Sequence, residues 1–384
     1  MDLSKYDQYR PPQYDYWMRY TFNNYWPNID EHFDKFRIIY AGANADTSFK
    51  TRPIDNTIME ITDAYALGIR VFFFECLSEG VMLEDMDMLK IITDGVSHLP
   101  DIQLFYLSGD YRAEVSVKEH FKDTPINFKT IGISHYDFSA RAHPEYNKSY
   151  VIGHRDKKFL CFNKVPRQHR IDFLNQVVNH NLLDDSYYSF DCEEHELFQM
   201  IHKQKLTGIP KIRYNIPLKL NKTDERSNPV NIIEDDFKYF ENSYFSVVTE
   251  TMFYHPNHIH VTNGRALHIP GTYPGTFISE KTFKCVRMKH PFIIVGSAGM
   301  LEFLRSRGYK TFSPFIDESY DAVEDDMLRM QMIVNEVVRL CNLPDDELIE
   351  FTKFAKDIVE HNYTHLENIS DFTTMGNLQS ILNI

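Results

Sequence analysis

Basic residues are scarce in this chain relative to acidic ones. Its 384 residues include 41 Lys and Arg against 55 Asp and Glu, which gives a formal net charge of −14. Proteins that hold nucleic acid by broad phosphate neutralisation need clustered cations, so this balance argues against that class and leaves room only for a local basic cleft. Long biased tracts are also absent, and 43% hydrophobic with 25% charged residues indicate an ordered globular protein.

Long apolar runs and paired cysteines are missing as well. No run of about 18 apolar residues occurs, and the first residues contain no apolar core of a signal peptide. The five cysteines are odd in number and show no Cys-x-x-Cys spacing, which indicates reduced, buried thiols. We therefore expect a cytoplasmic protein without a membrane span.

Metal-binding patterns are weak. Three histidines, His255, His258 and His260, lie close together, but Pro256 and the short spacing keep all three imidazoles from meeting at one ion. The four Asp-Asp pairs lack the Asp-x-Asp spacing of a metal site. We expect a polar loop at the histidines, and we predict neither a metal nor another cofactor.

The sequence does contain two series of alternating strand-like and helix-like segments, one on each side of Gly153. A chain of this length exceeds one ordinary core and suits two domains of roughly 150 to 200 residues. The predicted strands are 36–42, 69–75, 102–107, 126–134, 158–162, 187–190, 244–250, 292–295 and 309–312. The predicted helices are 57–67, 83–95, 166–179, 194–205, 298–307, 324–340 and 344–363.

This alternation predicts an α/β fold with two Rossmann-like parallel-sheet domains that face a cleft, with ligands at the carboxyl ends of the strands. We place the N-terminal domain at 1–152, beginning with a Tyr-rich arm, and the second domain at 153–345. We expect a C-terminal helix and tail at 346–384. Packing of this segment against the N-terminal domain is one alternative for it.

Residues 277–296 form the most informative stretch, FISEKTFKCVRMKHPFIIVG. A Ser-Glu-Lys triplet opens a helix that Pro291 ends, and a β-branched strand follows. Unpaired N–H groups at the helix start favour an anion, Lys281 can neutralise phosphate, and Glu280 can accept from ribose hydroxyls, as in a nucleotide-sugar site. The alternative is that Ser279 only caps the helix while Glu280 and Lys281 are solvated.

Two other segments should reach the same edge of the second sheet. The turn after its first strand, residues 163–170, contains Arg167 and Arg170 at a helix start, a cradle for polyphosphate. The strand at 244–250 ends in a carboxylate, Glu250. These segments meet only in the predicted fold, and there they form a donor site with residues 279–281.

The strand at 244–250 and the stretch at 277–296 together resemble the signature of α1,3-fucosyltransferases and exostosin-like enzymes. In that family a strand ends in Phe-Glu-Asn-Ser and is followed by Tyr-(Val/Ile)-Thr-Glu-Lys, a helix, and Val-Pro-Val-Val-x-Gly. The matching residues here are Glu250 in the first element, Phe277, Ser279, Glu280 and Lys281 in the second, and Pro291 and Gly296 in the third. The combination also looks like virus- and phage-encoded glycosyltransferases of the two-domain GT-B type.

The resemblance implies a hexosyl- or pentosyltransferase with a nucleotide-sugar co-substrate. It implies contacts of Glu280 with the ribose and of Lys281 with the phosphate, and Arg167 or Arg170 would help with the diphosphate. Cations and helix ends stabilise the leaving diphosphate in such enzymes, so a metal is not required. Thr251 and Met252 replace the family's Asn-Ser, so the resemblance does not imply GDP-fucose.

An inverting enzyme of this kind also needs a base in the first domain for the acceptor hydroxyl. The candidates at predicted strand ends are Glu75, Asp110 and His135, with Asp46 as a further one. Glu75 is the first choice because it ends the most apolar strand, where partial burial makes a carboxylate a better proton acceptor. The alternative for each is a residue that caps a loop.

The acceptor stays open between a glycan, a protein and a lipid. One alternative function is a viral or phage DNA-base glycosyltransferase that acts on a hydroxymethylated base. This function needs a basic groove and base flipping, and the net charge counts against it. A second alternative is a non-catalytic binding or structural protein of a virus that keeps the glycosyltransferase fold.

Overall fold

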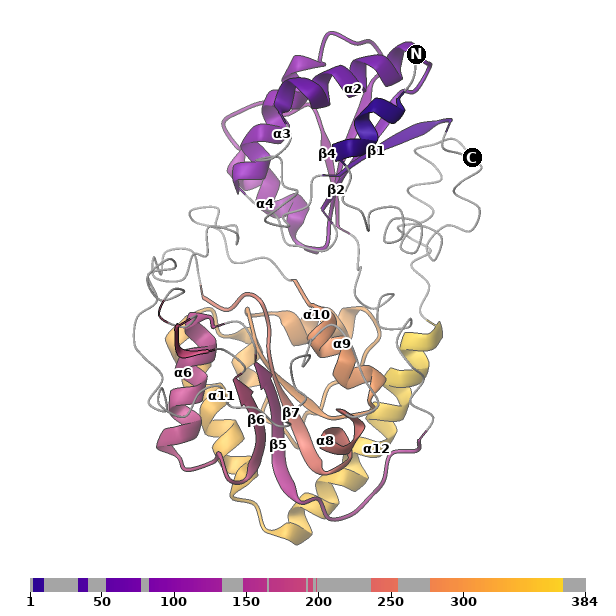
Figure 1. Ribbon diagram of the computed structural model, residues 1–384. Coiled ribbons are helices and arrows are strands. Elements are labelled where there is room, and N and C mark those ends of the chain that lie inside the picture. The colour runs from indigo at the N-terminus through magenta and orange to yellow at the C-terminus, as the bar shows by residue number, and fades with distance from the viewer. Residues whose placement is uncertain are drawn as a thin grey trace. The chain divides into compact units, whose positions relative to one another are not determined.

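The computed structural model describes residues 3–9, 34–40, 53–76, 83–132, 148–163, 166–190, 193–195, 198, 236–254 and 277–368. Two compact units make up the chain (Figure 1). The first contains the described residues up to 132 with Phe277, and the second contains those in 148–254 and 278–368. Each unit contains one four-stranded parallel sheet with helices, which confirms the predicted α/β class with two parallel sheets.

The first sheet has the order β1-β2-β3-β4. Its strands are β1 (Phe36–Tyr40), β2 (Val71–Cys76), β3 (Gln103–Ser108) and β4 (Lys129–Gly132). The accompanying helices are the 3-10 helix η1 (Ser4–Tyr9), α2 (Ile54–Ala66), α3 (Leu83–Gly95) and α4 (Ala113–His120).

Strand β2 explains why the middle of this sheet is so apolar. Phe72 and Phe74 belong to the core that α2, α3 and α4 share with the sheet. Phe73 points to the other face, where its ring lies 5.6 Å from that of Phe36 and 5.4 Å from that of Phe105. A strand buried on both faces has a nearly continuous apolar sequence, which is why β2 was predictable.

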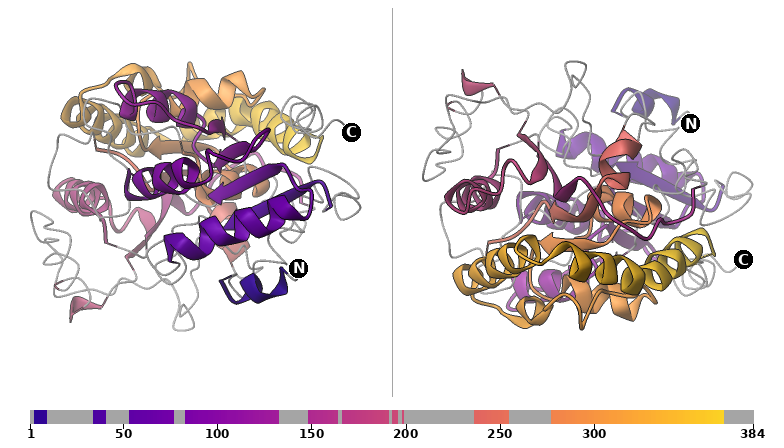
Figure 2. Two further views of the ribbon diagram at one scale, coloured as in Figure 1. Left: turned by 90° about the horizontal axis from the view of Figure 1, so that it is seen from above. Right: turned by 90° about the horizontal axis from the view of Figure 1, so that it is seen from below.

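The second sheet has the order β6-β5-β7-β8. Its strands are β5 (Lys157–Asn163), β6 (Ser186–Phe190), β7 (Ser243–Thr249) and β8 (Phe292–Val295). The helices are α6 (Gln168–Asn179), α8 (Phe237–Glu241), α9 (Glu280–Arg287), α10 (Met300–Ser306), the 3-10 helix η6 (Ser319–Ala322), α11 (Asp326–Cys341) and α12 (Asp345–Asn368). Figure 1 and Figure 2 show α12 running along one side of this unit, where it contacts α9.

The strand order creates a switch point between β5 and β7. The chain leaves β5 toward β6 on one side and later enters β7 on the other side of β5. The loops that follow β5 and β7 therefore diverge, and ligands of open α/β sheets bind outside the carboxyl ends of strands at such a point. The start of α6 and the end of β7 lie at this point.

One predicted strand, 309–312, is wrong. The N–H and C=O groups of this segment bond to side chains instead of to β8. Lys310 N donates to Asn362 Oδ1 at 2.7 Å, and Asn362 Nδ2 donates to Lys310 O at 2.8 Å. Phe312 N donates to Glu318 Oε1 at 2.6 Å. The sequence also did not predict α4 or α8. Most of the Tyr-rich arm, most of the predicted helix at 194–205 and the histidines at 255–260 lie outside the described residues.

The predicted domain boundary at 152/153 stays a prediction, because residues 133–147 lie outside the described residues. The segment that follows is tied to α12, since Tyr150 N donates to Glu360 Oε1 and Gly153 N to Thr352 Oγ1, both at 3.1 Å. The described free cysteines, Cys161, Cys285 and Cys341, are buried. No helix in the described ranges is long and apolar enough to cross a membrane.

Candidate functional site

The ends of three neighbouring strands are linked at the carboxyl edge of the second sheet. Thr249, the last residue of β7, donates from Oγ1 to Asn163 Oδ1 at the end of β5 at 2.5 Å. Glu250 N donates to Val295 O at the end of β8 at 3.0 Å. These bonds hold the residues that follow β5, β7 and β8 together at one edge of the sheet, which we call the rim.

Glu250 fixes the start of α9. Its carboxylate is 0% exposed and accepts from Ser279 N at 3.2 Å, from Ser279 Oγ at 2.5 Å and from Thr282 Oγ1 at 2.6 Å. An anion at a helix N-terminus is favoured by the unpaired N–H groups and the helix dipole. The anion that α9 receives is thus a carboxylate of the chain itself.

Ser279 is indeed the N-cap of α9 and accepts from Lys281 N, but the two residues after it are not solvated. Glu280 is buried, and the Lys281 side chain is 14% exposed. Lys281 Nζ donates to Ser279 Oγ at 2.7 Å and to Glu280 Oε1 at 2.9 Å, and it lies 3.9 Å from Glu250 Oε2. Burial opposes ionisation of Glu280, yet the charge and hydrogen bond of Lys281 outweigh it and lower the pKa of Glu280.

The first turn of α6 holds the loop after β7 from the other side. Arg170 donates to Thr249 O and Arg167 to Thr251 O, each at 3.3 Å. His169 Nε2 donates to Glu250 O at 2.8 Å. The structure therefore brings together the three segments that the sequence placed at one edge.

Burial and crowding of like charges set the electrostatics of this turn. Burial, together with the charge of Arg167, lowers the pKa of Arg170 to about 9. Burial and the two neighbouring arginines lower the pKa of His169 well below its ordinary value, so this imidazole is neutral. Because Nε2 carries the proton, Nδ1 keeps a lone pair, and it makes no hydrogen bond within the described part of the chain.

Side chains of both charge types meet at this rim. Three cations, Arg167, Arg170 and Lys281, lie around two carboxylates, Glu250 and Glu280. The first turn of α6 contains no acidic residue. A site with cations beside carboxylates can bind a ligand that is anionic at one end and donates hydrogen bonds at the other.

Arg329 of α11 supports the rim and was missed by sequence reasoning. Its side chain is 1% exposed and donates to Gly296 O at 3.1 Å and to Phe253 O at 2.6 Å, joining the loops after β8 and β7. It also pairs with Asp326 at 2.6 Å and covers the Phe253 ring at 4.4 Å. The Asp326–Arg329 spacing of three residues was the only signal, and it is typical of ordinary exposed helix pairs.

The first unit contains the candidates for a catalytic base. Glu75 is buried at the end of β2, opposite Leu107 of β3. Asp110 accepts from Arg112 N at 2.8 Å through Oδ1 and from Ala113 N at 3.1 Å through its carbonyl, so it caps the start of α4. His135 lies outside the described residues. Within the described ranges, no three His, Cys, Asp or Glu side chains are grouped to hold a metal ion.

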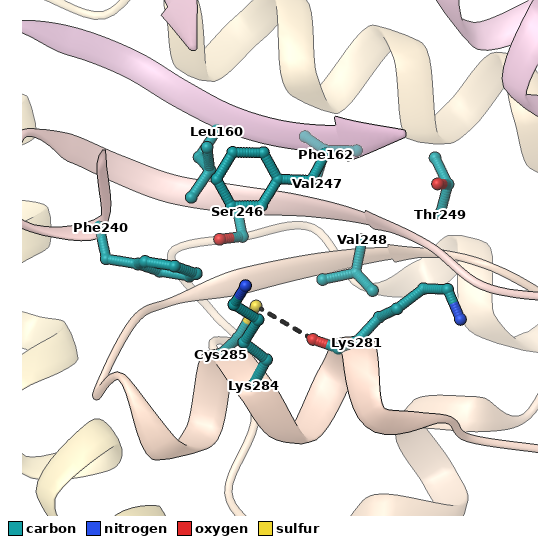
Figure 3. A pocket seen from close by; sticks show the side chains of 10 residues that line it. All are labelled: Leu160, Phe162, Phe240, Ser246, Val247, Val248, Thr249, Lys281, Lys284 and Cys285. Carbon is teal, nitrogen blue, oxygen red and sulfur yellow. Dashed lines mark hydrogen bonds between the residues drawn. The ribbon is translucent and has the colours of Figure 1, made fainter. Parts of the chain in front are cut away.

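A pocket adjoins the rim between the second sheet and α9 (Figure 3). It is small, with a cavity volume of about 30 Å³, enough for about two water molecules. The lining residues are Leu160, Phe162, Phe240, Ser246, Val247, Val248, Thr249, Lys281, Lys284 and Cys285. Thr249 and Lys281 belong to the rim as well, so pocket and rim are continuous.

Comparisons with protein-family models and with curated proteins give no match. Among solved structures, the crystal structure of T4 phage BGT in complex with its UDP-glucose substrate is similar over 91% of this chain and 100% of that chain, with 9% sequence identity and a TM-score of 0.35. A TM-score of that size carries no argument about this chain. The case for a function therefore rests on the residues at the rim.

Proposed function

We propose that this protein is a GT-B-type glycosyltransferase that transfers a sugar from a nucleoside diphosphate donor to an acceptor hydroxyl. The observation that carries this proposal is the convergence of three cations beside two buried carboxylates at the carboxyl edge of the second sheet. Arg167, Arg170 and Lys281 converge there from α6 and α9. A diphosphate is the common metabolite group that such a cluster neutralises best.

Lys281 is the residue that we assign to the leaving diphosphate. Its ammonium is partly exposed and is bonded to Ser279 Oγ and Glu280 through the side chain alone, so phosphate oxygens can replace these partners without a backbone change. Charge that develops on the diphosphate during transfer is stabilised most by a fixed cation in a site with little water. Arg167 and Arg170 add to this field, and Arg170 stays charged at neutral pH.

Glu280 is assigned to the ribose. Its lowered pKa keeps it ionised at neutral pH, and an ionised carboxylate accepts strong hydrogen bonds from sugar hydroxyls. For Glu250, predicted to be part of the donor site, we propose a different role, because its two oxygens accept hydrogen bonds from Ser279 and Thr282. It positions the site instead of contacting the donor.

The acceptor base is proposed in the first unit. Glu75 is the first candidate because its carboxylate is buried at the end of β2, and Asp110 and His135 are the others. For the acceptor we propose no more than a hydroxyl group of a glycan, protein or lipid, since no described feature favours a DNA base.

The direct test is donor binding by wild type and by Lys281→Ala. A panel of UDP-, GDP-, ADP- and CMP-sugars should include one class that raises the melting temperature, because only a ligand of the folded state stabilises it. Loss of a charge-assisted contact of about 1.5–3 kcal/mol should weaken that donor about 10- to 100-fold in Lys281→Ala. The matched control is Lys353→Ala, since Lys353 of α12 is half exposed and pairs with the exposed Glu350.

Donor binding by Lys281→Ala as tight as that of wild type would contradict the assignment. Slow release of free sugar from the bound donor, measured without any acceptor, separates an enzyme from a protein that only binds. A protein that binds the donor yet never hydrolyses it would support the binding-protein alternative.

A further inference from the structure

The buried imidazole of His169 in α6 contacts the loop after β7 at several points. The residue is 1% exposed, and its Nε2 lies 2.8 Å from Glu250 O. The ring stacks on that of Phe253, with centroids 5.8 Å apart and 16° between the planes. The ring of Tyr254 meets it edge to face at 6.4 Å. One imidazole thus contacts both ends of the segment 250–254.

This imidazole is a neutral hydrogen-bond donor. A carbonyl oxygen can only accept, so Nε2 carries the hydrogen of the bond to Glu250. Arg167 and Arg170 lie on the same turn of the chain, and burial with these two charges lowers the pKa of His169 well below its ordinary value. His169 therefore binds the loop without adding a third positive charge to that turn. Glutamine can reproduce such a neutral donor.

The segment that His169 contacts lies between two of the proposed diphosphate-binding cations. Thr251 is partly exposed, whereas the other residues of the segment are buried. Arg167 Nη1 donates to Thr251 O at 3.3 Å, and Lys281 Nζ donates to Thr251 Oγ1 at 3.5 Å. A cation from the start of α6 and a cation from α9 are therefore both placed against this one residue.

The bond from His169 determines where Thr251 lies. The carbonyl that accepts from Nε2 belongs to the peptide group that joins Glu250 to Thr251. A peptide group is planar and leaves only two soft torsions per residue, so fixing this plane restricts the position of Thr251. Stacking on Phe253 holds the chain again two residues later. A rotation of this peptide would move both contacts that Thr251 makes with the cations.

We propose that His169 is a positioning residue that sets the spacing of two donor-site cations, Arg167 and Lys281, through the loop after β7. Cations that are already in place bind phosphate more tightly than mobile ones, because ordering them costs nothing when the ligand arrives. His169 itself needs no contact with the donor. This inference rests on the proposed function, since these cations must hold the donor phosphates for their spacing to matter.

The test is calorimetric binding of inorganic pyrophosphate to the full chain and its variants. His169→Phe keeps a ring that can stack on Phe253 but removes the donor to Glu250 O. It should weaken pyrophosphate about ten-fold, which lies in the range for residues that modulate a site without contact to the ligand. His169→Gln keeps a neutral N–H donor of similar reach, so its affinity should stay within about three-fold of wild type.

His290→Phe is the matched control. His290 is also buried, and its Nε2 donates to Ser243 O at 2.8 Å, at the first residue of β7. Burial lowers its pKa to about 3, so this imidazole is neutral too. The variant loses a bond of the same kind at the opposite end of the same strand. It should lower the melting temperature, yet its pyrophosphate affinity should equal that of wild type.

A second measurement separates positioning from general damage to the rim. Because His169 acts through the cations, its effect should shrink when one of them is absent. His169→Phe combined with Arg167→Ala should therefore weaken pyrophosphate by a smaller factor than His169→Phe does in wild type. His169→Asn, whose shorter amide does not reach Glu250 O, replaces the phenylalanine variant in both measurements if that variant does not fold.

Several outcomes overturn the inference. These are wild-type affinity in His169→Phe, an affinity of His169→Gln as weak as that of His169→Phe, an equal loss in His290→Phe, and an equal factor with and without Arg167. In each case the proposed donor site still stands if pyrophosphate binding depends on Lys281. If neither pyrophosphate nor any nucleoside diphosphate binds to wild type, the proposed function fails and the inference fails with it.

Discussion

Replacing Glu250 tests whether the start of α9 depends on the buried carboxylate at the end of β7. In Glu250→Gln one carboxylate oxygen becomes an amide NH₂ group, which cannot accept. The Ser279 hydroxyl, now 2.5 Å from Oε2, loses its acceptor, and Lys281, 3.9 Å from the same oxygen, loses a compensating charge. One lost charge-assisted hydrogen bond is worth about 1.5–3 kcal/mol, so we expect a loss of about 2–3 kcal/mol in the free energy of unfolding.

Glu250→Ala should be much more severe. It removes the acceptor of all three donors, Ser279 N, Ser279 Oγ and Thr282 Oγ1, in a site that water does not reach. Each buried unpaired donor costs about 1–3 kcal/mol, for a total of about 3–9 kcal/mol. Whole proteins are stable by only about 5–15 kcal/mol, so this variant should be marginally folded.

Amide hydrogen exchange read by mass spectrometry is the suitable assay. Both tryptophans precede residue 30, far in sequence from α9, so their fluorescence is a poor reporter of the second sheet. In Glu250→Gln the amides of α9 should exchange about 30- to 150-fold faster than in wild type through local opening, while those of α2 and α3 should not change. Unchanged exchange in α9, with urea stability within about 0.5 kcal/mol of wild type, would refute this account of the carboxylate.

Two further predictions concern buried charge and buried imidazole. Arg329→Met should cost about 3–5 kcal/mol in urea denaturation because it removes the cation paired with the buried Asp326 and frees two loop carbonyls. Arg339→Met removes a half-exposed arginine paired with Glu336 and should cost about 1 kcal/mol or less. Equal costs would contradict the rim role of Arg329. The pKa of His290 is about 3 in the folded protein and near 6.5 in the unfolded chain. The free energy of unfolding should therefore be highest above about pH 6.5 and should fall as the pH drops toward 3. We expect a loss of about 2 kcal/mol between pH 7 and pH 5. In His290→Gln the free energy of unfolding should depend less on pH by this amount. An identical pH dependence in the variant and in wild type would exclude this contribution of His290.

Much of the fold was predictable because buried faces of helices and strands require apolar residues at regular spacing in the sequence. The helix predicted at 83–95 has the bounds of α3, and the strand predicted at 244–250 differs from β7 by one residue at each end. The segment 309–312 was not predictable, because side chains of Asn362 and Glu318 bond its backbone in place of a neighbouring strand. Asn362 is distant in sequence, and neither partner leaves a periodic pattern in the segment.

The convergence of the rim was also predictable, whereas its internal contacts were not. Parallel strands end at one edge, and this is enough to bring Arg167, Glu250 and Lys281 together once β5 and β7 are neighbours. The burial of Arg329 was hidden, because an arginine in the first turn of an amphipathic helix is normally solvated. Only the carbonyl groups of Phe253 and Gly296, supplied by two other elements, make its position favourable.

The start of α9 differs in part from both alternatives that the sequence offered. The sequence predicted open N–H groups there for a phosphate, but Ser279 N is taken by Glu250 and Lys281 N by Ser279 Oγ. The internal carboxylate satisfies the helix end, so the helix offers a ligand mainly the side chains of Lys281 and Glu280. It follows that a donor diphosphate at this rim depends on cationic side chains more than on the helix dipole, and that its affinity should fall steeply with each cation removed.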